Sequence, residues 1–341
     1  MIDSLRQRLR DLTAVPGLAG YEDPITRRMA TALAATARHV EIDRLGNIIA
    51  RYGTGSPRIA VLAHLDTIGL LVQRVHRDGS LGVVPVGGIN LKALPGSAVR
   101  LHTADGDRPG VIGVRSQHLA RPGDLNSTVD DLYIDAGAAP VEIATPVTYA
   151  PQALDLGERF SAPYLDNRAG CAVLLELAEH LLDVSGEVIL IGTVQEETTC
   201  AGAQLALAAT QPDAALFVDG TVSYDTPDTA GRGAVALGGG PVLTAFLYVS
   251  GLNGWHAHPA LRDHLKDSAR AAGLAFQQDA VHGLMSDARV TIWSGIPSAL
   301  IGLPLRGKHG PLETIDLRDA AAAVTLLLTA LKRPLPDLAR G

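Results

Sequence analysis

An apolar run that ends in two adjacent carboxylates constrains the fold of this chain more than any other segment. Residues 188–194 read Val-Ile-Leu-Ile-Gly-Thr-Val, and Gln195, Glu196 and Glu197 follow them. A run that is apolar on both faces predicts a strand buried inside a sheet. In open α/β sheets, ligands collect at the carboxyl ends of such strands. Because grouped carboxylates are costly to bury without a cation, the run predicts further metal-type ligands at neighbouring strand ends.

The order of helical and β-type patterns predicts an α/β protein with a β-rich insert. Apolar residues repeat at helical spacing within 2–13, 21–38, 171–182, 202–209, 259–273 and 317–331. Apolar runs predict strands at 40–43, 47–52, 59–66, 187–194, 214–218, 241–249 and 296–303.

The β-rich insert is predicted where the helical period disappears, between about residue 70 and about residue 158. Short β-type runs separated by turn formers such as Asp78-Gly79 favour a small β-barrel or sandwich there. The remaining segments, 1–69 and 159–341, would then form one α/β domain. A long β-rich edge of a single domain is the alternative.

Composition narrows the class of protein. The chain has 341 residues, 47% of them hydrophobic, and a net charge of -7, so it lacks the basic footprint of a nucleic-acid-binding protein. Its two cysteines, Cys171 and Cys200, give no disulfide framework. Neither a signal-peptide pattern nor a membrane-spanning apolar run is present. These features predict a cytoplasmic protein that binds neither nucleic acid nor membrane.

Candidate metal ligands lie at the ends of several predicted strands and at the start of one predicted helix. They are His64, Asp166, Glu197, Asp219 and His309, and Asp66, two residues after His64 on the same face of the strand, could orient that imidazole. Three of them, Asp166, Glu197 and Asp219, carry three negative charges, which two divalent cations and a bridging hydroxide would balance. Mixed histidine and carboxylate ligands suit zinc, with cobalt or manganese as alternatives.

Other polar and glycine-rich segments are weaker candidates for a metal or phosphate site. A lone His-X-Asp sequence is more often ordinary polarity than a metal site. His256, His258 and His264 lie beside or within a helical pattern and are poor metal candidates. The glycine-rich residues 231–240 lack the strand-to-helix context of a phosphate-binding loop, so we interpret them as a turn.

An ordered set of short motifs along nearly the whole chain resembles a known enzyme family. The motifs are Pro16-Gly-Leu-Ala-Gly-Tyr-Glu22, Asp43-Arg-Leu-Gly-Asn47, Ala63-His-Leu-Asp66, Asp166-Asn-Arg-Ala-Gly170, Val194-Gln-Glu-Glu197, Val218-Asp219 and Lys308-His-Gly-Pro311. Together they resemble the tetrahedral aminopeptidases, the di-zinc family that includes glutamyl aminopeptidase. The resemblance implies a three-layer, zinc-peptidase-like α/β fold with a mostly parallel sheet.

The resemblance also implies roles for the candidate residues. His64 and Asp219 would hold one metal ion, Glu197 and His309 the other, and Asp166 would bridge both. Glu196 would be the general base, and Asp66 would orient His64. The β-rich insert would form dimers, which assemble into hollow tetrahedral dodecamers in that family.

Two loops depart from the family pattern. Thr199 and Ala201 replace a glycine and an arginine, and Gly307 and Gly310 replace a tyrosine and a serine. Since no predicted ligand is lost, the departures bear on specificity and assembly contacts. We also expect the polar segment 121–131 to be a mobile loop reaching toward an active site.

The sequence therefore predicts a metal-dependent aminopeptidase that acts on peptides. An N-acyl amino acid deacylase or dipeptidase using the same metals is one alternative. An inactive assembly or binding protein of this fold is another. A glycosidase is disfavoured, because Glu196 and Glu197 are adjacent rather than facing each other across a sugar.

Overall fold

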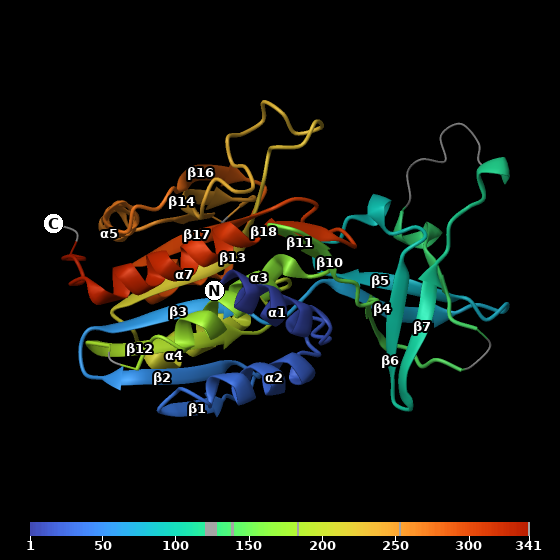
Figure 1. Cartoon of the computed structure of the whole chain (residues 1–341). Helices are drawn as coiled ribbons and strands as arrows, with labels where there is room; N and C mark the ends of the chain where they lie inside the picture. Colours follow the sequence, from blue (N-terminus) through green and yellow to red (C-terminus); the bar gives the residue numbers. More distant parts are fainter. Residues whose placement is uncertain (120–127, 138–139, 183, 252–253, 340–341) are drawn as a thin grey trace.

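A computed structural model describes the chain except for residues 120–127, 138–139, 183, 252–253 and 340–341. Figure 1 shows a large body built from a sheet and helices, with a smaller β-rich body beside it. The predicted fold class is confirmed: a mixed α/β fold that carries a closed β-barrel. In the part of the chain that is described, no helix is long and apolar enough to cross a membrane.

A nine-stranded sheet forms the centre of the large body. Its strands are β1 (His39–Ile42), β2 (Ile48–Thr54), β3 (Arg58–His64), β12 (Gly186–Thr193), β13 (Ala214–Val222), β14 (Val242–Tyr248), β15 (Gly254–His256), β16 (Gln277–His282) and β17 (Ser298–Leu305). Their order is β1-β2-β12-β3-β13-β17-β14-β15, and β16 pairs with β14. The middle strands β12, β3, β13 and β17 are parallel, so their carboxyl ends meet at one edge.

Helices cover both faces of this sheet, which gives the three layers. The helices are α1 (Ile2–Thr13), α2 (Asp23–Leu33), α3 (Leu165–Ala178), α4 (Ala201–Thr210), α5 (Pro259–Ala271), α6 (Thr291–Ser294) and α7 (Leu317–Lys332). One apolar cluster joins the sheet to α1, α2, α3, α5 and α7 through residues such as Leu9 and Leu174. A second cluster on the other face includes Ala206 and Phe217. Both faces are therefore buried, as expected for strands that are apolar on both sides.

Six strands close into the barrel. They are β4 (Gly69–Val75), β5 (Leu81–Val86), β6 (Ala98–Thr103), β7 (Gly106–Ile112), β8 (Tyr133–Asp135) and β9 (Pro146–Tyr149). Val72, Leu101 and Ile134 are buried in its interior. The barrel therefore has its own apolar core, rather than being a β-rich edge of the large sheet.

The remaining elements are short. A three-stranded sheet contains β10 (Leu154–Leu156), β11 (Arg159–Ala162) and β18 (Glu313–Asp316). Single 3-10 turns are η1 (Leu91–Ala93), η2 (Gln117–Leu119), η3 (Val129–Asp131) and η4 (Asp287–Val290). β10 follows the last barrel strand, β9, in the chain, but it pairs with β11 and not with a barrel strand. The chain therefore leaves the barrel between β9 and β10. The domain limits at 69/70 and 158/159 stay a prediction.

Some sequence-based expectations differ from the structure. The helix expected over 21–38 spans only Asp23–Leu33, because the chain must turn before β1 pairs with β2. Barrel strands β4 and β9 were not predicted, and both owe their place to partners distant in sequence. Most of the loop expected over 121–131 lies outside the described residues, and its last residues form η3.

Candidate active site

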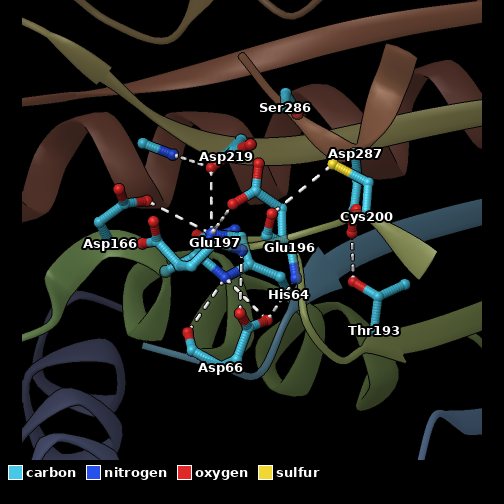
Figure 2. Close-up of polar contacts among 12 residues, drawn as sticks. His64, Asp66, Asp166, Thr193, Glu196, Glu197, Cys200, Asp219, Ser286 and Asp287 are labelled. Atoms are coloured by element: carbon cyan, nitrogen blue, oxygen red, sulfur yellow. Dashed lines mark hydrogen bonds and ion pairs between the residues drawn. The ribbon is translucent and has the colours of Figure 1, made fainter. Parts of the chain in front are cut away.

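The predicted site residues meet at the edge where the parallel strands end. His64 is the last residue of β3, Asp219 lies in β13, and Glu196 and Glu197 follow β12. Asp166 lies at the start of α3 with non-helical backbone angles, so its carboxylate stands at the N-terminus of the regular helix, where the helix dipole favours a negative charge. Asp66, His64, Asp166, Glu196, Glu197 and Asp219 all point into one cluster (Figure 2). Residues from four separate segments are thus brought together.

Two groups of metal-type donors share Asp166. In the first, His64 Nε2 lies 3.5 Å from Asp166 Oδ1 and 3.5 Å from Asp219 Oδ1. In the second, His309 Nε2 lies 3.2 Å from Asp166 Oδ2 and 3.5 Å from Glu197 Oε1. Among the described residues, Asp166 Oδ1 and Glu197 Oε1 are buried without a hydrogen-bond donor. Buried acceptors of this kind, facing imidazole nitrogens, fit divalent cations.

His64 is oriented by residue 66, through its main chain. The Nδ1 atom of His64 lies 3.1 Å from the Asp66 carbonyl oxygen and 3.6 Å from the Asp66 carboxylate. The Nε2 atom consequently faces the carboxylate cluster. Burial lowers the pKa of His64, but Asp166, Asp219 and Asp66 outweigh it and raise the pKa well above its usual value.

The carboxylate of Asp66 has a second set of partners. Its two oxygens accept hydrogen bonds of 2.9 Å each from the backbone N–H groups of Glu196 and Glu197. One fully buried carboxylate therefore fixes the main chain at the position where two functional side chains diverge. The sequence predicts that Asp66 lies beside His64, but it does not predict this contact with the backbone after β12.

Glu196 and Glu197 occupy different surroundings. Burial raises the pKa of Glu196 well above its usual value; His64 opposes this shift, and the negative charges of Asp219 and Glu197 add to it. Burial raises the pKa of Glu197 to about 7, although His309 opposes the shift. His64, Glu196 and Glu197 also form a third possible donor group, with Glu196 Oε2 3.9 Å from His64 Nε2. Distances alone consequently do not separate a metal ligand from a base here.

His309 contacts the barrel as well as the cluster. Its Nδ1 atom faces the carbonyl oxygen of Gly88, in the loop after β5, and Asn90 donates a 3.2 Å backbone hydrogen bond to the His309 carbonyl. Burial lowers the pKa of His309, but Asp166 and Glu197 raise it to about 9. The barrel therefore helps to fix the ring of one predicted ligand.

Sequence reasoning missed Glu313 and Lys308. Glu313 accepts hydrogen bonds of 2.7 Å from the backbone N–H groups of Asp166 and His309. Lys308 pairs with the Asp166 carboxylate. The only signal in the sequence is nearness to His309, because both roles depend on β18 and the preceding loop folding back onto α3.

The three histidines considered weak candidates lie elsewhere. His264 is on α5 and contacts the carbonyl oxygen of Ala330. Neither His256 nor His258 belongs to a possible metal-binding group of the described residues. The glycine-rich segment 231–240 contains no strand or helix, in agreement with its interpretation as a turn.

Comparison with known proteins gives the site its context. The sequence pattern of the M42 glutamyl aminopeptidases matches residues 46–326. A lysyl aminopeptidase of Pyrococcus furiosus is 31% identical over 96% of this chain and 97% of its own. Among solved structures, an aminopeptidase from Desulfurococcus kamchatkensis is 28% identical, with a TM-score of 0.92 over 98% of this chain and 96% of its own.

A second solved structure bears on assembly. The Pyrococcus horikoshii TET1 peptidase, which can assemble into a tetrahedron or a large octahedral shell, is 28% identical with a TM-score of 0.85. It covers 96% of this chain and 99% of its own length. The family match, the sequence identity and the shared fold agree with one another, and the chain belongs to the M42 glutamyl aminopeptidase family.

Proposed function

We propose that this protein is an aminopeptidase that uses two divalent metal ions to hydrolyse the N-terminal peptide bond of peptides. The observation that carries the proposal is the pair of donor groups that share the Asp166 carboxylate. One oxygen of Asp166 faces His64 and the other faces His309. A carboxylate placed in this way suits a bridge between two ions. His64 and Asp219 would complete one position, and Glu197 and His309 the other.

When bound, such ions lower the pKa of water and polarise the peptide carbonyl group. Glu196 is the proposed general base, which accepts the proton of the attacking water and delivers it to the leaving amine. Its raised pKa, caused chiefly by burial, suits a group that must take up and release a proton in one turnover. Asp66 would hold Glu196 in place through the backbone and also fix the imidazole of His64.

Zinc is the proposed metal, with cobalt and manganese as alternatives. The donors are two imidazoles and three carboxylates, a mixture that all three ions accept. Metal content after purification without chelators identifies the bound ion. Restoration of hydrolysis by each ion, added singly to chelator-treated protein, then shows which ions support the reaction.

The requirement for a free amine distinguishes the proposed reaction from deacylation. We expect hydrolysis of aminoacyl-p-nitroanilides and none of their N-acetylated counterparts. Cleavage of N-acetyl amino acids would instead support the deacylase alternative. Absence of bound metal and of metal-restored hydrolysis would support the inactive assembly protein.

The preferred N-terminal residue needs its own test. The family is described as the glutamyl aminopeptidases, whereas the Pyrococcus furiosus relative is a lysyl aminopeptidase. Glutamyl and lysyl residues carry opposite charges, so neither preference transfers to this chain. A panel of acidic, basic and apolar aminoacyl-p-nitroanilides ranks them by kcat/KM.

We further propose a homo-oligomer built from dimers, with the barrel as the dimerisation domain and a tetrahedral dodecamer as the full assembly. The assembly of the Pyrococcus horikoshii relative supports this. So do exposed apolar side chains on or near the barrel, namely Val75, Val111, Val114 and Ile143. Light scattering should give several times the chain mass, and a monodisperse monomer would contradict the proposal. Cytoplasmic location and the absence of nucleic-acid binding stay predictions.

A further inference from the structure

Lys308 places a positive charge inside the cluster of predicted metal ligands. Its ammonium group pairs with Asp166 Oδ2 and donates a 3.2 Å hydrogen bond to the carbonyl oxygen of Gly220. The side chain is only 10% exposed. Burying an ammonium group is costly unless a carboxylate compensates it, so this lysine is held by the negative charge of the site.

Arg168, another buried cation of the large body, contacts main-chain carbonyl groups instead of carboxylates. Arg168 is fully buried, yet its guanidinium donates to the carbonyl oxygens of Leu12 and Val15 and contacts that of Leu65. Among the described lysine and arginine side chains, Lys308 alone forms an ion pair with Asp166. A lysine amine is ordinarily charged at neutral pH, and the carboxylate of Asp166 against it compensates that charge in the buried site.

Lys308 contacts an oxygen that belongs to only one of the two donor groups that share Asp166. It contacts Asp166 Oδ2, the oxygen that also faces His309 Nε2 at 3.2 Å. The other oxygen, Oδ1, faces His64. An ion held by Asp166, Glu197 and His309 would therefore share its Asp166 oxygen with the ammonium group, whereas an ion held by His64, Asp166 and Asp219 would not.

We propose that Lys308 is a built-in counter-cation that competes with one of the two metal ions for Asp166 Oδ2. The inference rests on the proposed function. The carboxylates of Asp166, Glu197 and Asp219 carry three negative charges, and the paired ammonium group of Lys308 cancels one of them. One divalent ion balances the charge that remains. The position formed by His64, Asp166 and Asp219 then fills first. The position formed by Asp166, Glu197 and His309 fills second, and only as Lys308 leaves Asp166.

Metal titration of the full-length, chelator-treated protein tests the order. Zinc binding is followed by competition with a chromophoric chelator for wild type and three variants. Lys308→Met keeps the length and the apolar stem but removes the charge, Lys308→Gln gives the same test if the methionine variant does not fold, and Lys308→Arg keeps the charge. Lys266→Met is the matched control, because Lys266 pairs with Asp263 on α5.

The expected result is two unequal steps in wild type. Lys308→Met should tighten the second step by about tenfold or more, an effect of the size that groups bonded to metal ligands commonly have, while the first step is unchanged. Lys308→Arg and Lys266→Met should keep the wild-type order and affinities. A second step that is unchanged or weaker in Lys308→Met would overturn the inference.

Thermal unfolding supplies a readout that is independent of activity. In excess chelator, Lys308→Met should melt below wild type, because the carboxylates lose their counter-charge. With both positions filled by zinc, that difference should disappear. An equal deficit in both conditions would show a purely structural role and overturn the inference, although the two-metal function would stand. A wild-type protein that binds no zinc would overturn both.

Discussion

Glu313 Oε1 accepts a 2.7 Å hydrogen bond from the backbone N–H of His309, so a buried carboxylate on β18 fixes the loop that carries a predicted metal ligand. Burial and the nearby charge of Asp166 raise the pKa of Glu313 to about 8, although two backbone N–H groups oppose this. Glu313 belongs to none of the possible metal-binding groups of the described residues, so its role here is to hold the backbone of Asp166 and His309.

Replacing Glu313 by glutamine should weaken zinc binding by about 10- to 100-fold, because the amide cannot accept from both N–H groups that the carboxylate serves. Zinc affinity is measured by chelator competition. Glu187→Gln is the control, since Glu187 pairs with Arg51 near the start of β12. Equal zinc affinities in Glu313→Gln and wild type would contradict a positioning role.

Asp66→Asn tests the carboxylate that accepts from the N–H groups of Glu196 and Glu197. The asparagine NH₂ group would face one of these donors, which leaves a buried N–H unpaired at a cost of about 1–3 kcal/mol. We expect a lower kcat and a lower melting temperature. Asp213→Asn is the matched control, because Asp213 also accepts a hydrogen bond from a backbone N–H group, that of Arg58. The idea fails if kcat is unaffected by Asp66→Asn.

Gly88→Ala tests the contact between the barrel and the metal site. A Cβ atom at Gly88 would lie 3.2 Å from His309 Nδ1, which is tight enough to displace the imidazole. Zinc binding at the position that includes His309 should weaken by about tenfold, an effect typical of changed partners of a ligating histidine. The first zinc step serves as the internal control. A loss confined to that first step would count against the assignment of His309.

These residues also show how far the sequence could predict the site. Strand-end carboxylates such as Glu197 and Asp219 follow from local patterns, because parallel strands bring their carboxyl ends together. The contacts of Glu313, Gly88 and Lys308 do not follow from local sequence patterns. Each depends on a segment that returns from a distant part of the chain, such as the barrel loop at Gly88. The barrel itself was predictable only as a β-rich segment, since its closure depends on non-local pairs such as β4 with β9.

The raised pKa of Asp319 should make the free energy of unfolding depend on pH. It accepts 2.8 Å hydrogen bonds from the N–H groups of Gly238 and Gly240, yet burial raises its pKa to about 6. The folded chain thus holds this proton more tightly than the unfolded chain. The resulting stabilisation is present below pH 3.8 and is lost as pH rises through about 6.

The comparison of wild type with Asp319→Asn isolates that group from other titrations. Urea unfolding at a series of pH values should show wild type losing stability relative to Asp319→Asn as pH rises between pH 3.8 and about 6. A constant difference across this range, or a relative gain by wild type, would contradict the sign.

Glu196 is proposed to move the proton, and Glu197 to hold a metal ion. The measurement is kcat together with bound zinc for Glu196→Gln and Glu197→Gln, each with wild type as reference. Glu196→Gln should keep both ions and lose at least about 100-fold in kcat. Glu197→Gln should lose zinc, and excess zinc should partly restore its rate. If Glu196→Gln instead loses zinc while Glu197→Gln keeps both ions and loses its rate, this assignment is contradicted and the two residues exchange roles.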